Sequence, residues 1–192
     1  MNHKWKNPHK IDTLLNMKVV IAPDQKLRFK TTPVKKITPK FLETLKEMEK
    51  LTKTYLDPEG VGLAATQVGL TEQFFVAKLE NDKGKEKFKA YINPKIISYS
   101  KTTKLFFEGC LSIPDYYGEI TRPSAVEVSY MDEQGKQIKE KLTGFPAWVF
   151  QHEYDHLQGK LFMDLVLSQK AKLFKVVGKD RAGADIFEEV GI

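Results

Sequence analysis

The sequence predicts one α+β domain with mostly antiparallel strands. One segment has the periodicity of an amphipathic helix, and short segments rich in β-branched and aromatic residues follow it, separated by turn residues. A composition of 41% hydrophobic and 29% charged residues is ordinary for a globular protein, and 192 residues suffice for a sizeable core. We expect a polar N-terminal extension at residues 1–16 and one domain at residues 17–192.

The first expected element is a helix at residues 39–56, "PKFLETLKEMEKLTKTYL". Pro39 suits its first turn, and "DPEG" at residues 57–60 supplies residues that end it. The side chains that share one face of this helix are Phe41, Leu42, Leu45, Met48, Thr52 and Tyr55.

Strands are expected next, in "FFVAKL" (74–79), "FKAYINPKIISYS" (88–100) and "AVEVSYM" (125–131), with "ENDKGKE" and "RPS" as breaks. The segment "SYMDEQGKQIKEKL" predicts a hairpin with its turn at "DEQG". A short helix should begin near Pro146 and end before Gly159, which suits a left-handed C-terminal position. Residues 165–177 suggest a final helix, followed by a tail.

Composition also limits the expected cellular location and binding partners. No apolar run approaches membrane-spanning length, and the N-terminus lacks the apolar region of a secretory signal. Cys110 is the only cysteine, so no intramolecular disulfide can form, and a cytoplasmic or organelle-matrix location is expected. The net charge of +6 favours a solvated, lysine-rich surface over an anionic partner such as ribosomal RNA, since no aromatic ladder is interleaved with the lysines. We expect a monomer.

The main candidate site is "QHEYDHLQG" at residues 151–159, directly after the apolar run "FPAWVF". On a helix, His152 and His156 lie one turn apart on one face, so both imidazoles can reach one cation, and Glu153 can contact a metal-bound water. An ordinary helix with exposed polar residues is the alternative. The preceding apolar segment argues against it, because an unpaired buried histidine is costly.

A catalytic metal site commonly has three protein ligands and one open position. No acidic residue after His156 belongs to a recognisable motif, whereas Cys110 stands in "EGCLSIP" at residues 108–114. A Cys–His–His set suits zinc or ferrous iron. Two alternatives for Cys110 are a small buried hydrophobic residue and a protease nucleophile with His152 as its base.

A third segment, "GVGLAATQVG" at residues 60–69, fits the G-x-G-x-x-A pattern of a dinucleotide-binding loop. A helix precedes it, however, where such a loop requires a strand. Two interpretations remain: a tight turn packed on the core, or a backbone exposed to a ligand with Gln67 presenting its amide.

The segments "GVGLAATQ", "EGCLS" and "QHEYDHLQG", in this order, resemble the peptide deformylase family of the compact bacterial or organellar type. The likeness runs from about residue 22 to residue 166. It implies small antiparallel sheets around a central metal-binding HExxH helix, in one catalytic domain at residues 17–192. It also implies removal of the formyl group from N-formylmethionyl peptides that leave the ribosome, with transient ribosome association.

The resemblance implies roles for individual residues. Cys110, His152 and His156 would hold one ion per chain, ferrous iron in the family and often zinc or nickel in its place. Glu153 would be the general base and acid, while Gln67 and the backbone N–H of Leu111 would polarise the formyl oxygen. The residues that would line the substrate site are Val61, Gly62, Gly109, Tyr117, Phe145 and Trp148.

Two segments depart from common family members. Tyr117 stands where many bacterial members carry an arginine, and "FPAW" precedes the helix motif where smaller aliphatics are usual. Both differences concern substrate preference rather than the reaction. Trp148 should form a wall of the pocket for the first substrate side chain, or else fill the core behind it. Arg122 is a candidate partner for Asp155 or Glu108.

Two other functions fit part of this pattern. An HExxH zinc peptidase would need a third histidine or glutamate ligand in a recognisable motif, and none follows the helix. A structural zinc site is normally closed by four protein ligands, whereas the sequence offers three convincing ones.

Overall fold

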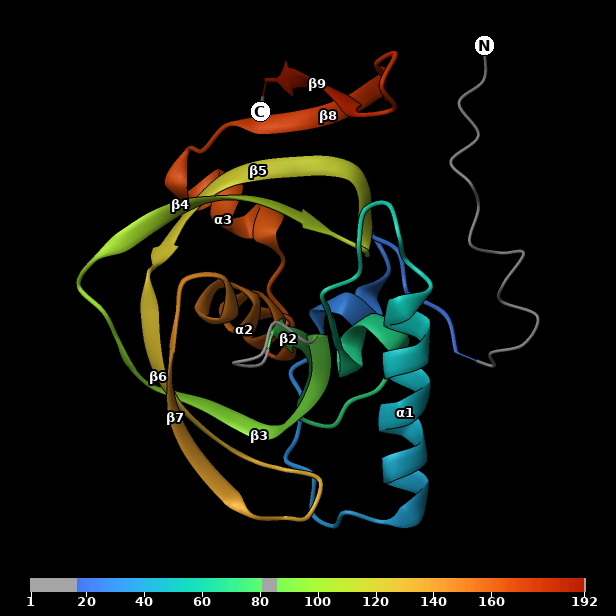
Figure 1. Cartoon of the computed structure of the whole chain (residues 1–192), viewed down its shortest axis with the longest axis vertical. Coiled ribbons are helices and arrows are strands. Elements are labelled where there is room, and N and C mark those ends of the chain that lie inside the picture. The colour runs from blue at the N-terminus through green and yellow to red at the C-terminus, as the bar shows by residue number, and fades with distance from the viewer. Residues whose placement is uncertain (1–16, 81–85, 192) are drawn as a thin grey trace.

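The computed structural model describes residues 17–80 and 86–191, so the expected N-terminal extension lies outside the described residues. Within these ranges, two antiparallel sheets surround the helix α2 (Gly144–Leu157), which contacts strands of both (Figure 1). Helix α1 (Pro39–Lys53) packs on β1 and β2. The predicted α+β class and the central HExxH helix are confirmed.

The larger sheet has the strand order β1–β2–β3–β6–β7, and its neighbours are antiparallel. Its strands are β1 (Gly62–Ala64), β2 (Phe74–Glu80), β3 (Glu86–Tyr99), β6 (Ala125–Met131) and β7 (Gln137–Thr143). The three predicted strands and the hairpin are therefore confirmed. The hairpin turns where expected, since Asp132 Oδ1 accepts backbone hydrogen bonds from Gln134 and Lys136, and Gly135 has a φ of 80°.

The smaller sheet has the order β4–β5–β8–β9, so β4 is an edge strand among the described residues. Its strands are β4 (Thr103–Cys110), β5 (Ile113–Pro123), β8 (Leu173–Lys179) and β9 (Asp185–Val190). The predicted helix at residues 165–177 is wrong in its second half. Helix α3 (Phe162–Gln169) stops where Lys170 adopts a left-handed φ of 51°, and β8 then pairs with β5. The expected tail is the strand β9, paired with β8.

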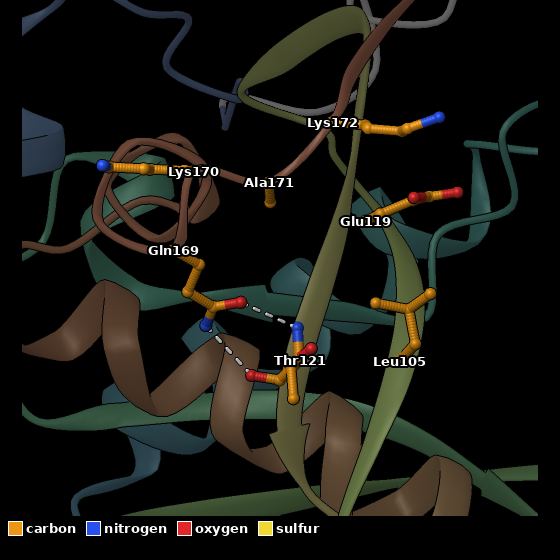
Figure 2. Close-up of a pocket in the computed structure, with 7 residues that line it drawn as sticks. All are labelled: Leu105, Glu119, Thr121, Gln169, Lys170, Ala171 and Lys172. Carbon is orange, nitrogen blue, oxygen red and sulfur yellow. Dashed lines mark hydrogen bonds between the residues drawn. The ribbon is translucent and has the colours of Figure 1, made fainter.

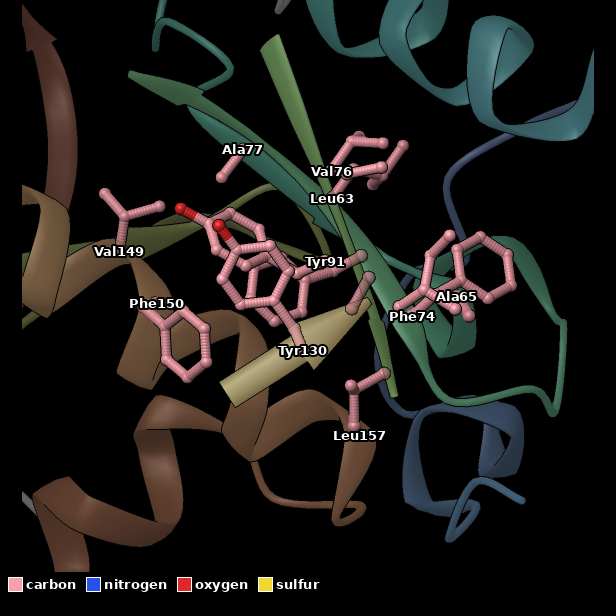
Figure 3. Packing of buried hydrophobic residues seen from close by; sticks show 14 of the residues in the cluster. Leu63, Ala65, Phe74, Val76, Ala77, Tyr91, Tyr130, Val149, Phe150 and Leu157 are labelled. Carbon is pink, nitrogen blue, oxygen red and sulfur yellow. The ribbon is translucent and has the colours of Figure 1, made fainter. Parts of the chain in front are cut away.

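The main core fills the space between α2 and the larger sheet (Figure 3). Period-two alternation along β6 buries Val126, Val128 and Tyr130 while Glu127 faces outward. Phe150 of α2 meets the sheet through aromatic contacts, with ring centroids 5.2 Å from Phe75 and 5.1 Å from Tyr91. Each such buried ring contributes about 1.5–3 kcal/mol of burial free energy, which holds α2 rigidly in place.

Helix α3 is fastened to the smaller sheet by one side-chain amide. Gln169 Oε1 accepts a hydrogen bond from the Thr121 backbone N–H at 2.9 Å, and its Nε2 donates to the Thr121 carbonyl at 3.0 Å (Figure 2). A surface hollow lies beside these two hydrogen bonds. None of the residues that line it belongs to the sequence motifs of the candidate site.

Candidate metal centre

Helix α2 carries the motif histidines. It begins at Gly144 with Pro146 in its first turn, close to the predicted start. Gly159, with a φ of 71°, follows its end as predicted. A side chain there would be strained and would also meet the Arg28 carbonyl oxygen at 2.5 Å. The helix end is therefore fixed, and the HExxH turn lies in the buried interior.

Strand β4 faces α2 with every second side chain, which we call its inner face. Successive residues of this face meet successive turns of the helix, because two strand residues span about 6.6 Å and one helical turn spans about 5.4 Å. The facing pairs are Phe106 with Trp148, Glu108 with His152, and Cys110 with His156.

The last of these pairs forms the candidate metal cluster. Cys110 Sγ lies 3.3 Å from His156 Nε2, and the ligand atoms of Cys110, His152 and His156 all lie within 4.8 Å of one another. His152 is 8% exposed and His156 is 1% exposed. One thiolate and two imidazoles suit a zinc or ferrous ion, and three protein ligands leave a coordination position for water.

Glu153 is buried beside this cluster. Its Oε2 has no hydrogen-bond partner among the described residues, and burial raises the pKa of its carboxyl to about 7. A Cβ on Gly62 would lie 2.4 Å from Glu153 Oε1, so only glycine fits there. An unpartnered buried carboxyl needs a polar neighbour that the described residues do not supply, which is consistent with a hydrated metal ion.

Gln67 directs its amide N–H groups toward the cluster. It lies in the 3₁₀ turn η3 (Ala65–Val68), and its Oε1 accepts a hydrogen bond from the Ala64 N–H at 2.8 Å. Its Nε2 donates to Ser112 Oγ at 3.2 Å and lies 3.5 Å from Cys110 Sγ. The segment is thus a tight turn packed on the core, and the Gln67 side chain directs its amide toward Cys110. Exposure of its backbone to a ligand stays a prediction.

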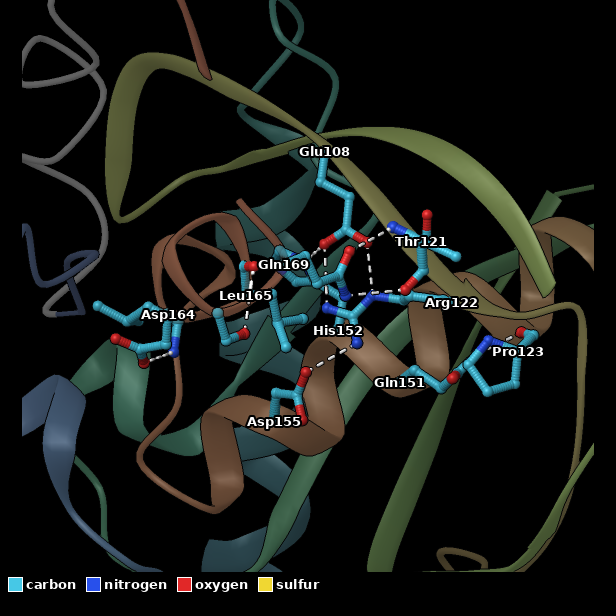
Figure 4. A network of polar contacts seen from close by, with 12 residues as sticks. Glu108, Thr121, Arg122, Pro123, Gln151, His152, Asp155, Asp164, Leu165 and Gln169 are labelled. Atoms are coloured by element: carbon cyan, nitrogen blue, oxygen red, sulfur yellow. Dashed lines mark hydrogen bonds and ion pairs between the residues drawn. The ribbon is translucent and has the colours of Figure 1, made fainter. Parts of the chain in front are cut away.

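Arg122 joins three acidic and imidazole groups into one network (Figure 4). Its Nε and Nη2 donate to Glu108 at 2.5 and 3.0 Å, and its Nη1 donates to Asp155 at 2.8 Å. Glu108 Oε2 lies 3.1 Å from His152 Nδ1. The predicted partnership of Arg122 is confirmed with both candidates.

This network sets the protonation of its members. Burial alone would raise the pKa of Glu108, but hydrogen bonds from His152 and Arg122 outweigh it and lower that pKa to about 2. An ionised Glu108 accepts from His152 Nδ1 and leaves Nε2 free to face the cluster. Burial, together with nearby positive charges, lowers the pKa of His156 well below its ordinary value, so its ring is neutral, as a metal ligand must be.

The remaining candidate residues lie on α2, on β5, next to Cys110 in sequence, or just before β1. Val61 and Leu111 pack against the main core. A Cβ on Gly109 would lie 2.5 Å from the Tyr117 ring, so this ring covers the backbone next to Cys110. The Trp148 ring stacks on Phe106 with a centroid distance of 5.5 Å, and Phe145, 49% exposed, lies edge-on to Trp148 at 5.1 Å.

The sequence analysis missed three roles near the site. These are Glu108 as the partner of His152, Ser112 as the partner of Gln67, and Phe106 as the partner of Trp148. Each lies two or four residues from Cys110. A strand assignment for residues 103–110 would have placed Phe106 and Glu108 on the same face as the cysteine, whereas Ser112 lies beyond the end of that strand. The sequence offered no clear strand signal there.

Residues 16–172 match the family model for polypeptide deformylase. The peptide deformylase of Rhizobium meliloti (strain 1021) is 38% identical over 152 residues, which cover 79% of this chain and 86% of that protein. That of Thermotoga neapolitana is 40% identical over 159 residues, covering 82% and 92%. The crystal structure of the Thermotoga maritima peptide deformylase aligns with a TM-score of 0.69 at 38% identity, over 78% of this chain and 96% of that one.

The chain belongs to the peptide deformylase family. Peptide deformylases are metal-dependent hydrolases that remove the formyl group from N-terminal formylmethionine, and the chain is a hydrolase of this class. The match spans the three motifs and the Cys–His–His metal site that they form. It ends at residue 172, just before β8 and β9.

Proposed function

We propose that the chain removes the formyl group at this cluster, with Cys110, His152 and His156 holding one ferrous ion that zinc or nickel can replace. The observation that supports this most is the convergence of three ligand atoms within 4.8 Å on the buried helix. When bound, such an ion polarises the formyl oxygen and lowers the pKa of a coordinated water. Iron follows from the family, since thiolate and imidazole ligands suit zinc as well.

Glu153 moves the proton in this proposal. Its Oε2, buried and without a protein partner, takes a proton from the attacking water. The same atom later returns a proton to the departing amine of the peptide. A carboxyl whose pKa is raised to about 7 by burial can both accept and donate near neutral pH.

Gln67 and Leu111 stabilise the oxyanion in this proposal. The Ala64 N–H donates a hydrogen bond to Gln67 Oε1. Only the amide oxygen can face this donor, so the orientation of the Gln67 amide is fixed. Its Nε2 is held beside Ser112 and Cys110, so one of its N–H groups would reach an oxygen that develops negative charge there. The backbone N–H of Leu111, next to Cys110 in sequence, would supply the second donor.

The first substrate side chain would enter between β4 and α2. Val61, Phe145 and Trp148 would line this pocket, while Gly62 and Gly109 admit the peptide backbone without a side chain in its way. Tyr117 would cover the peptide at Gly109. A wall of Trp148 and Phe106 makes the pocket aromatic, which suits a methionine thioether.

The test is an anaerobic preparation on which metal content and activity are measured together. The proposal predicts one iron per chain, hydrolysis of formyl-Met peptides, and no cleavage of the same peptides without the formyl group. Cleavage of internal peptide bonds in an unblocked peptide would instead indicate an HExxH zinc peptidase. A metal-loaded sample inactive on both substrates would contradict the proposed site.

The proposal also covers the oligomeric state, the location and the ribosome contact of the enzyme. No helix in the described part of the chain is long and apolar enough to cross a membrane. We propose a monomer in which residues 17–192 form a single catalytic domain, located in the cytoplasm or an organelle matrix, with transient ribosome contact. Sedimentation of the enzyme alone and with ribosomes at two salt concentrations tests the oligomeric state and the contact.

A further inference from the structure

Four aromatic rings gather on the outer face of the smaller sheet, and we call this cluster the aromatic shelf. Its members are Phe107 (β4), Tyr117 (β5), Phe174 (β8) and Phe187 (β9). Phe107 lies 5.2 Å from Tyr117, 5.4 Å from Phe174 and 5.1 Å from Phe187, measured between ring centroids. Phe107 remains 43% exposed and Phe187 39% exposed. Contiguous exposed rings of this kind commonly mark a binding surface.

The C-terminal hairpin builds half of this shelf. Strand β8 begins at Leu173, directly after the match to the deformylase family ends at residue 172. Lys179 at the far end of β8 pairs with Asp185 of β9 at 2.8 Å and with Asp57 at 2.6 Å. Asp57 lies in the segment that leads into β1, so Lys179 links the hairpin to the segment before Val61 and Gly62.

The shelf also reaches the metal cluster closely. The Tyr117 ring lies where a Gly109 side chain would be, with its Cε1 atom 2.5 Å from the ideal Cβ position. Gly109 precedes the ligand Cys110 directly. The outer face of β4 thus continues from the shelf to within one residue of the cluster, with no side chain in between.

We propose that the aromatic shelf is a subsite for the second side chain of the formyl-peptide substrate and selects large apolar, above all aromatic, residues there. Strand β4 is an edge strand among the described residues, and an extended peptide can lie along such an edge. Side chains of an extended peptide alternate between the two faces. With the first side chain on the inner face near Trp148, the second lies on the outer face beside Phe107. This inference rests on the proposed function.

The experiment compares kcat/KM for formyl-Met-Phe-Ser and formyl-Met-Ser-Ser. Wild-type enzyme should prefer the phenylalanine peptide by roughly threefold to tenfold, the range of one additional aromatic contact. Phe187→Ala should reduce this ratio toward one, and Phe187→Leu should give an intermediate ratio. The matched control is Ile186→Ala, because Ile186 is 45% exposed on the same strand but points to the opposite face. The control should keep the wild-type ratio.

Each other outcome contradicts the proposal in a distinguishable way. Equal rates on the two peptides with wild-type enzyme would overturn the shelf and leave the proposed function standing. A wild-type ratio in a folded Phe187→Ala would also overturn it. Should Phe187→Ala lower the melting temperature by more than the control does, Phe107→Leu and Phe187→Leu decide the question, and an unchanged ratio in both would overturn the shelf. No hydrolysis of either peptide by metal-loaded wild type would contradict the proposed function itself.

Discussion

The two faces of strand β4 differ in almost every physical respect. On the inner face, Glu108 is fully buried and ionised, and hydrogen bonds from His152 and Arg122 satisfy it. On the outer face, Leu105 and Phe107 are 56% and 43% exposed, and the Phe107 ring stacks on Tyr117. The inner face supports chemistry, since charges there are unscreened and fixed in position. The outer face instead presents exposed apolar side chains that can contact apolar groups.

The largest effect on stability is expected at Arg122 on the inner side. Arg122→Ala leaves the carboxylate of Glu108 buried without its guanidinium partner, which should cost about 3–5 kcal/mol of unfolding free energy. Urea denaturation of the metal-loaded enzyme measures this cost. The control is Arg181→Ala, an exposed arginine whose loss should change stability by less than about 0.5 kcal/mol. Similar losses in both variants would show that the buried network adds no more stability than an exposed arginine does.

A smaller effect is expected at Trp148, the α2 residue that stacks on Phe106 of the inner face. If Trp148 narrows the pocket for the first side chain, Trp148→Ala should raise kcat/KM for formyl-Phe peptides relative to formyl-Met peptides by roughly tenfold. Metal content should not change, because the ligands lie one and two turns away. The ratio of the two kcat/KM values decides between pocket and core. An unchanged ratio in a folded, metal-loaded variant places Trp148 in the core.

The sequence predicted the inner face better than the outer one. The four-residue spacing of His152 and His156 and the lone Cys110 are local features, and Pro146 and Gly159 were enough to predict the helix that carries the histidines. The network through Arg122 depends on residues 14 and 33 positions away. Its partners were predicted from charge and analogy alone.

The outer face depends on pairing between strands that are distant in sequence, and the residues of these strands give only weak local signs of strand structure. The segment after Gln169 has helix-forming lysines, yet Leu173, Phe174 and Val176 form a strand because β5 offers an edge to pair with. Tertiary pairing outweighs intrinsic preference there. The shelf, whose members come from four strands, could not be predicted once β8 was taken for a helix and β9 for a tail.

The smallest expected effect lies outside both faces, at Asp164. Partial burial would raise the pKa of Asp164, but hydrogen bonds from Arg28 and from the Leu161 backbone outweigh it and lower that pKa. A lowered folded-state pKa adds stability above the unfolded pKa, and this stability is lost as pH falls through the folded value. Asp164→Asn should therefore cost about 1 kcal/mol or less at pH 7, and this cost should diminish as pH falls below the unfolded pKa. A cost independent of pH would assign the effect to the hydrogen bond from the Leu161 N–H at the start of α3, which asparagine can still accept.

The central claim is that Cys110, His152 and His156 hold the metal while Glu153 moves the proton, and Glu153→Gln separates these two roles. The account predicts a variant with wild-type metal content, because all three ligands remain, and a rate of formyl-Met hydrolysis lower by about 10²–10⁴. Both quantities should be measured on one anaerobic sample. Normal metal content with near wild-type turnover would contradict the role of Glu153.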